Sequence, residues 1–332
     1  MRTRRDFILL GLTLGAGIFP DLSVLASEAN DDSVSPTLKE MIRHSLLVHS
    51  LYRLPVSRNY APDGAAGVNV NGYQWIEEQR QGAEWIVRGY AQDNQDWISI
   101  GWRLLDWGLD QQQTDGSFAS KDAFHSTSFF IEALARSCII DPTAASARRV
   151  DGLARGARWL MRGDVEEGGS ANIRPYTHRR YILAAAFGQT AAVTGEKKFA
   201  ERAAAWAREG LALQQGDGTN PEKNGFDASY QMVGVLMSLR YLPVCGVAGL
   251  RKHLRSMIRN ATLLELRHQN PDGSIDAEGS TRIGKEHSRA GITKSVSYGE
   301  VLQALVYGAQ ALPQPEWISP AERIASYQKW LK

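Results

Sequence analysis

A structural unit of about fifty residues repeats along the chain. Glycine-containing turns recur at successive spacings of 52, 53, 49 and 55 residues. A fixed period of this length predicts a repeat architecture, in which each supersecondary unit stacks on the next. The five turns are Asp63-Gly64, Asp115-Gly116, Gly168-Gly169, Asp217-Gly218 and Asp272-Gly273.

Each turn lies between two segments with helical periodicity. In residues 228–242, apolar side chains fall at Met232, Val235, Leu236 and Leu239, which is the spacing of one helix face. Strand-like alternation is nearly absent, so we expect ten to eleven paired helices, beginning at residues 37–52. Helices that lead into turns are expected at residues 96–113, 149–162, 199–215 and 250–269, and helices that follow turns at residues 73–92, 126–139, 179–193, 228–241 and 295–311.

The helix after each turn is the more apolar of the two. Phe129-Phe130-Ile131 and residues 182–187 carry almost no charge, whereas residues 199–213 keep a polar face with Glu201 and Arg208. Apolar helices suit the inside of a ring and amphipathic helices its outside. An open solenoid would instead need polar end repeats. The pattern therefore favours an all-α fold, an (α/α) toroid of about five to six helical hairpins, as a single domain over residues 27–332.

Residues 1–26 have the layout of a removable export signal. A basic start is followed by an apolar run at residues 7–19 and by Ser23-Val24-Leu25-Ala26, with small residues where a signal peptidase reads. The apolar run is shorter than the roughly 20 residues of a membrane span. Thr3-Arg4-Arg5-Asp6-Phe7-Ile8 resembles the twin-arginine motif, although an ordinary secretory signal is the alternative. The resemblance implies a folded protein that the twin-arginine translocase carries to the periplasm or beyond, a periplasmic or secreted location.

Charge and cysteine content narrow the possible partners. The formal net charge of +2 includes three arginines of the leader, so the remaining chain is close to neutral and no nucleic acid partner is expected. Cys138 and Cys245 lie far apart, in no metal-ligand spacing. Both lie in apolar stretches and are expected to be buried free thiols, with one disulfide as the alternative. We expect neither a metal nor a cofactor.

Several segments resemble the α/α-toroid carbohydrate-active proteins. Glutamine-rich segments run into Asp-Gly-Ser or Asp-Gly-Thr turns before an apolar helix, as in toroid polysaccharide lyases, several glycoside hydrolases and terpene cyclases. Residues 224–231 (Asn-Gly-Phe-Asp-Ala-Ser-Tyr-Gln) are most similar to a segment of toroid polysaccharide lyases. The Asn-Asn-His motif of toroid alginate lyases and the Asp-x-Asp-Asp motif of terpene cyclases are both absent. The resemblance implies a polysaccharide or oligosaccharide substrate.

The turns also predict where a functional site would lie. Ten residues after four of the turns the chain carries Tyr73, His125, His178 and Asp227, where the inner helices begin. Ionisable side chains that converge on one mouth of a ring are what an active site needs, although Asp227 also suits a helix cap. The fifth turn is followed by a long loop at residues 275–294, and such loops often bind ligands.

Two reactions would use these residues differently. A lyase removes the proton beside a carboxylate and needs cations or amides, a His or Tyr base and a Tyr acid. A hydrolase needs two carboxylates, for which Asp227 could pair with Glu286, Asp122 or Glu167. We expect an exported polysaccharide-cleaving enzyme, with a β-eliminating lyase of an acidic polymer favoured over a hydrolase. A non-catalytic polysaccharide-binding or export accessory protein is a further alternative.

The candidate residues fall into two groups. The candidate catalytic residues are His178, Tyr230, Asp227, Tyr176 and His125. The candidate substrate-binding residues are Arg174, Asn224, Arg282, Glu286, His287, Tyr73 and Trp107, the last as a face on which a sugar could stack.

Overall fold

The computed structural model describes residues 64–67, 75–288 and 291–327. Contacts divide the chain into two units, Met1–Ser33 and Val34–Lys332, and every described residue belongs to the second. The predicted export signal, the predicted helix at residues 37–52 and Tyr73 lie outside the described residues.

The described residues form eleven α-helices and four short 3-10 helices, with isolated β-bridges and no β-strand. The α-helices are α4 (Gln81–Ala91), α5 (Gln95–Asp110), α6 (Ala123–Ile140), α7 (Ala147–Leu160), α8 (Gly163–Ile173), α9 (Thr177–Thr194), α10 (Lys197–Leu211), α11 (Tyr230–Tyr241), α12 (Ala248–Arg267), α13 (Tyr298–Ala311) and α14 (Ile318–Ser326). The 3-10 helices are η2 (Ile76–Arg80), η3 (Pro142–Ala144), η4 (Leu242–Val244) and η5 (Pro315–Trp317). None of these helices combines the length and apolar character that a membrane span requires.

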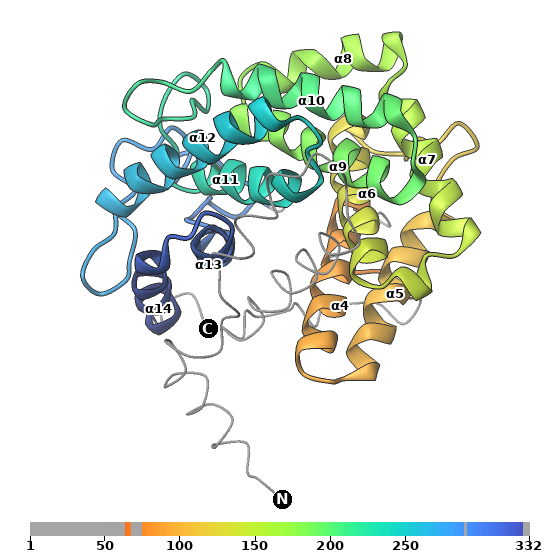
Figure 1. Ribbon diagram of the computed structural model, residues 1–332, viewed down its shortest axis with the longest axis horizontal. Helices are drawn as coiled ribbons and strands as arrows, with labels where there is room; N and C mark the ends of the chain where they lie inside the picture. The colour runs from red at the N-terminus through yellow and green to blue at the C-terminus, as the bar shows by residue number, and fades with distance from the viewer. Residues whose placement is uncertain (1–63, 68–74, 289–290, 328–332) are drawn as a thin grey trace, which may run out of the picture. The chain divides into compact units, whose positions relative to one another are not determined.

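The helices of the second unit form an inner set and an outer set. The inner helices pack in chain order, α4 and η2 on α6, α6 on α9, α9 on α11 and α11 on α13. Each outer helix packs on its own inner partner, α5 on α4, α7 on α6, α10 on α9, α12 on α11 and α14 on α13 (Figure 1). The second unit therefore has the predicted (α/α)-toroid fold, with five inner–outer pairs within the described residues.

Burial explains why the two sets differ in sequence. Sixteen of the eighteen residues of α6 are buried, because it has helices on several sides. Only six of the fifteen residues of α10 are buried, and this helix packs mainly on α9. An outer helix therefore needs one apolar stripe, whereas an inner helix is apolar nearly all round. This confirms the predicted assignment of the more apolar helices to the inside.

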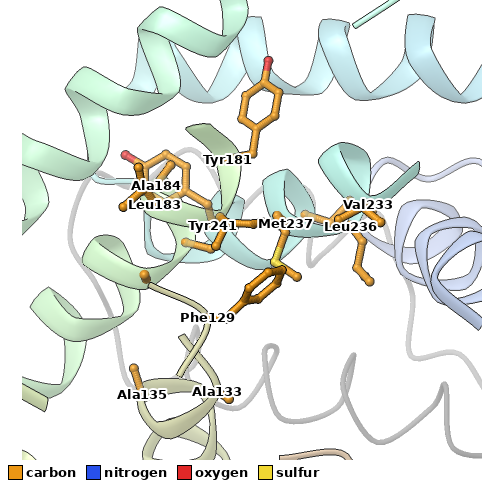
Figure 2. Close-up of a cluster of buried hydrophobic side chains, with 14 of the residues drawn as sticks. Phe129, Ala133, Ala135, Tyr181, Leu183, Ala184, Val233, Leu236, Met237 and Tyr241 are labelled. Atoms are coloured by element: carbon orange, nitrogen blue, oxygen red, sulfur yellow. The ribbon is translucent and has the colours of Figure 1, made fainter. Parts of the chain in front are cut away.

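The hydrophobic core lies between α6, α9 and α11. Figure 2 shows Phe129 from α6 and Tyr181 from α9 in one cluster with Leu236, Met237 and Tyr241 of α11. Cys138 and Cys245 are buried free thiols, as the sequence predicts.

A network of buried charges joins inner helices that are far apart in sequence. Arg136 of α6 pairs with Glu132 at 3.1 Å and with Glu84 of α4 at 3.1 Å. Arg240 of α11 reaches the same two carboxylates at 3.2 and 3.5 Å and donates to Gln303 of α13. We call Glu84, Glu132, Arg136 and Arg240 the central ion network. It ties α4 and α6 to α11 and α13.

Three of the predicted turns have one geometry. At Asp115-Gly116 the aspartate accepts a hydrogen bond from the backbone N–H of Ser117, and the Gly116 N–H donates to the Gln113 carbonyl. The same bonds recur at Asp217-Gly218 and Asp272-Gly273. A glutamine then ties each turn to the next outer helix: Gln112 to the Gly152 carbonyl, Gln214 to Met257 and Gln269 to Pro320. The glutamine-rich Asp-Gly segments are thus the joints between repeats.

The predicted turn at Gly168-Gly169 is wrong, because both residues lie inside α8. Neither glycine has a positive φ, unlike Gly116, Gly218 and Gly273. A Cβ on Gly169 would come within 2.4 Å of the Phe124 ring, so this glycine allows α8 to pack closely on α6. The pair therefore marks close packing rather than chain reversal.

A glycine substitution tests this interpretation of the joints. Gly218 has a φ of +99°, and an added Cβ would lie 2.6 Å from the Asn260 carbonyl oxygen of α12. Gly218→Ala should therefore lower the free energy of unfolding by about 1 to 3 kcal/mol. Gly216→Ala in the same turn is the matched control, since Gly216 has open space and no positive φ. Urea unfolding measures both, and equal effects of the two changes would contradict the interpretation.

Candidate functional site

Six charged or aromatic side chains gather where α9 and α11 begin. They come from the first turns of these helices and from two loops, residues 212–229 and 275–297. Contacts join them in a series: His178 contacts both Glu222 and Tyr230, Tyr230 contacts Arg282, and Arg282 contacts Glu286. We call them the mouth site: His178, Glu222, Asp227, Tyr230, Arg282 and Glu286.

His178 is held by two hydrogen bonds to Glu222. Its backbone N–H donates to Oε1 at 2.8 Å, and its ring Nδ1 lies 2.7 Å from Oε2. Glu222 is fully buried, and only 3% of His178 is exposed. No described residue hydrogen-bonds the second ring nitrogen, Nε2, so this atom is available to another partner.

Burial controls the protonation of this pair. It lowers the pKa of His178 well below its usual value, and the guanidinium groups of Arg179 and Arg282 act in the same direction. It raises the pKa of the Glu222 carboxyl well above its usual value, although the His178 amide and the charge of Arg282 oppose this. The imidazole is therefore uncharged at neutral pH. Its single ring proton is on Nδ1 when Glu222 is ionised, and on Nε2 when Glu222 is protonated and donates to Nδ1.

Tyr230 is stacked on the ring of His178. The ring centroids are 4.1 Å apart and the planes differ by only 19°. The guanidinium carbon of Arg282 lies 3.8 Å from the centroid of the Tyr230 ring, and Lys294 Nζ lies 3.4 Å from its hydroxyl. Burial raises the pKa of Tyr230 despite the opposing charges of Arg282 and Arg179, so the hydroxyl keeps its proton at neutral pH.

Glu286 gathers three cations from both loops. It accepts from Arg282 Nε at 2.8 Å, lies 3.3 Å from Lys294 Nζ and pairs with Lys223. Burial alone would raise the pKa of Glu286, but the hydrogen bonds from Lys223 and Arg282 outweigh it and lower the pKa. This anion therefore holds Arg282 and Lys294 beside Tyr230.

Asp227 is fixed at the start of α11. Its Oδ1 accepts from the backbone N–H groups of Ser229 and Tyr230, and its Oδ2 accepts from the Ser280 hydroxyl at 2.9 Å. This is the helix-cap arrangement that the sequence allowed as an alternative. The buried carboxylate also anchors the later loop through Ser280.

The mouth site borders a cavity of about 280 Å³. Its wall includes Asp227, Tyr230, Arg282 and Lys294, together with residues of the later loop. His178 does not line it, because it lies against the ring of Tyr230. Two cations beside a protonated phenol suit a ligand that carries a carboxylate.

Not every candidate residue lies at this cavity. Tyr176 does lie beside the mouth site, with Arg179, Arg282 and Lys223 within 4.7 to 5.9 Å of its ring centroid. The remaining described candidates lie elsewhere: His125 in the first turn of α6 against Phe129, Asn224 in an exposed turn, His287 in an exposed part of the later loop, Trp107 on the outer helix α5 and Arg174 at the end of α8.

Glu222 and Lys294 are the residues that sequence reasoning missed. Glu222 lies in the loop after Asp217-Gly218, between Pro221 and Lys223, where a charged residue reads as solvated. Its burial depends on the antiparallel bridge between Tyr176 and Glu222, which joins two loops distant in sequence. Lys294 ends the long loop that the sequence singled out, and only the folded loop places it at Tyr230.

The acids considered for a hydrolase do not form an open pair. Asp122 caps α6 and binds Arg179 at 3.0 Å, while Glu167 lies on α8 in a different cavity. Asp227 and Glu286 each already accept hydrogen bonds or ion pairs from several protein groups. Among the described residues, no three His, Cys, Asp or Glu side chains are grouped to hold a metal ion.

No protein-family model matches the chain, and no curated protein is detectably similar in sequence. Solved structures are similar in fold. An unsaturated glucuronyl hydrolase from Bacillus sp. GL1, described as responsible for glycosaminoglycan degradation, has a TM-score of 0.54 at 13% identity, over 87% of this chain and 82% of that one. A polysaccharide lyase has a TM-score of 0.55 at 10% identity, over 84% and 90%. A family 88 glycosyl hydrolase from Bacteroides vulgatus has a TM-score of 0.53 at 11% identity, over 88% and 84%. At these identities the likeness shows the shared fold.

A buried acid next to the mouth site should make stability depend on pH. Glu265 of α12 is fully buried, and neither carboxyl oxygen has a hydrogen-bond partner within the described part of the chain. Burial raises its pKa well above the usual value, and the charge of Asp227 adds to this. Above the unfolded pKa the folded state therefore holds a proton that the unfolded chain releases, and stability falls as pH rises by up to about 1.4 kcal/mol per unit.

Glu265→Gln should remove this dependence. The variant should gain stability over the wild type between about pH 5 and pH 8 in urea unfolding. Glu201→Gln, on the exposed face of α10, is the control and should change little. A constant difference between Glu265→Gln and the wild type at every pH would contradict the assignment of a buried proton.

Proposed function

We propose that the chain cleaves a carboxylate-bearing polysaccharide or oligosaccharide at the mouth site by β-elimination. The observation that carries this proposal is the uncharged His178 ring, fixed by Glu222 and stacked on a protonated Tyr230. A neutral imidazole can accept a proton and a phenol can donate one. Arg282 and Lys294 supply the positive charge that the substrate carboxylate needs.

In the proposed reaction, His178 Nε2 takes the proton beside the substrate carboxylate, while Arg282 and Lys294 stabilise the negative charge that develops there. The bond between the adjacent ring carbon and the glycosidic oxygen breaks, and a carbon–carbon double bond forms. Tyr230 donates its proton to the leaving oxygen, and the imidazolium returns a proton to the phenolate. This step uses the state in which Glu222 is ionised and accepts the Nδ1 proton, so that the lone pair of Nε2 is free and the carboxylate stabilises the imidazolium until it returns its proton.

Substrate entry requires a local movement. Only 3% of His178 is exposed, and the Tyr230 ring lies across it. The sugar must therefore seat against Tyr230 and shift this ring before Nε2 meets the proton. The short side chains of Ser295 and Ser297, which also line the cavity, leave room for such a shift.

A hydrolase is the second candidate, because two of the similar folds belong to glycoside hydrolases. It would need an accessible acid and base, whereas Asp227, Glu222 and Glu286 are each buried or bound by several partners. The leader at residues 1–26 supports a periplasmic or secreted location with a polymer met outside the cytoplasm, which stays a prediction.

The activity test uses a panel of uronate polymers. Cleavage should raise ultraviolet absorbance, because the new double bond is conjugated with the carboxylate. Tyr230→Phe and His178→Asn should each lower kcat by about a hundredfold or more. Tyr298→Phe is the matched control, since Tyr298 begins α13 as Tyr230 begins α11, and its hydroxyl accepts from the Ile275 N–H rather than facing the cavity of the mouth site. Release of saturated reducing ends would instead indicate the hydrolase, and binding without turnover an accessory protein.

The pH profile tests the role of His178. Since burial lowers the pKa of His178 well below 6.5, the ring stays neutral and competent as a base when the pH falls through 6.5. The value of kcat/KM should therefore hold between about pH 7 and pH 6 and decline only at lower pH. Glu222→Gln should move this acid limb and lower kcat more than it changes KM. A tenfold fall between about pH 7 and pH 6 in the wild type would contradict a neutral buried base.

A further inference from the structure

A second cavity lies on the outer side of the helix pair α9–α10, where α8 is inserted. Its volume is about 480 Å³, larger than the cavity at the mouth site and within the roughly 300 to 1,000 Å³ of small-molecule sites. We call it the outer groove. The residues that line the outer groove include Gly163, Glu167, Arg174, Arg180, Trp206 and Glu209.

The inserted helix creates this groove. Between the other described outer and inner helices, turns or loops without an α-helix take the place that α8 occupies between α7 and α9. Gly163 begins α8 at the groove wall, and no heavy atom lies within 4 Å of the point where a Cβ would stand. The absence of a side chain here leaves the groove open.

The groove carries equal numbers of positive and negative side chains. Arg202 pairs with Glu166 across it, and Arg180 lies 3.8 Å from Glu209. Arg174 and Glu167 are exposed at its edge, with no ion pair to any described residue. Three carboxylates repel a polyanion and three guanidinium groups repel a polycation. Hydroxyl groups both donate and accept, so an uncharged sugar satisfies both kinds of side chain.

Two buried donors on the groove have no hydrogen bond, although one of them, Arg180 Nε, is the atom that lies 3.8 Å from Glu209. Trp206 is 3% exposed and Arg180 is 9% exposed. The indole Nε1 of the first and the Nε of the second have no hydrogen-bond partner in the described part of the chain. An unsatisfied buried donor costs about 1 to 3 kcal/mol, which a ligand hydroxyl or a water would recover.

We propose that the outer groove binds an uncharged saccharide with neighbouring hydroxyl groups, separately from the acidic sugar expected at the mouth site. We expect the outer groove to bind a sugar without cleaving it, because its carboxylates are paired with Arg202 and Arg180 or lie at its edge. Binding at the outer groove does not depend on the reaction proposed for the mouth site.

Binding is measured on the full chain by calorimetry and saturation-transfer NMR. The probes are cellotetraose, laminaritetraose, mannotetraose and maltotetraose, with tetragalacturonate as the acidic comparison. Gly163→Leu should fill the groove and weaken binding by about tenfold or more. Gly168→Leu is the matched control, since it lies on the same helix with equally open space but does not line the groove. Arg174→Ala, at the exposed edge, should also weaken binding and does not perturb packing.

The outcomes separate this proposal from the one for the mouth site. Binding of a neutral tetrasaccharide that Gly163→Leu abolishes, and that Gly168→Leu and Tyr230→Phe leave within about twofold, supports the outer groove. No binding by any neutral probe, equal binding by both glycine variants, or preference for tetragalacturonate overturns it. Loss of uronate cleavage in Tyr230→Phe with unchanged neutral-sugar binding shows that the two sites act independently.

Discussion

The central ion network is the interaction on which the inner helices depend. Arg136 and Arg240 are buried, and both pair with the carboxylates of Glu84 and Glu132, while Arg240 also donates to Gln303. An unpaired buried charge costs several kcal/mol, so the four groups must occupy one arrangement together. Arg240 and Glu84 are 156 residues apart, and their contact fixes α11 relative to α4.

The mouth site uses that fixed frame through its loops. Two hydrogen bonds between His178 and Glu222 tie the loop at residues 212–229 to α9. Glu286 ties the later loop to Lys223 of the first loop and binds Arg282 within its own loop. Asp227 then joins the later loop to the start of α11 through Ser280. Each carboxylate therefore has a structural task and a local electrostatic effect. The site is built from anions that position cations and one imidazole, and it leaves a phenol facing the cavity.

The sequence predicted correctly those features of the fold that depend on residues close together along the chain. Helical periodicity, the fifty-residue spacing and the apolar character of residues 126–139 predicted the helix pairs and the inner set, since these depend on neighbours along the chain. The ten-residue offset from the Asp217-Gly218 turn led to Asp227 at the start of α11. His178 also lies at the start of an inner helix, although its offset was counted from Gly168, which lies inside α8. The offsets could not reveal Glu222, because its burial depends on a bridge to Tyr176. The turn predicted at Gly168-Gly169 was wrong because the sequence alone does not distinguish a glycine that allows close packing on Phe124 from a glycine that a turn requires.

The two thiols have a consequence for the compartment in which the chain folds. Cys138 is 3% exposed and Cys245 is 1% exposed, and neither is bonded to the other. Burial also raises the pKa of Cys138 to about 12, so the reactive thiolate is scarce at neutral pH. The described fold therefore needs no oxidant to form, and these sulfurs resist oxidation once it has formed. The same structure is compatible with assembly in a reducing compartment and with service in an oxidising one.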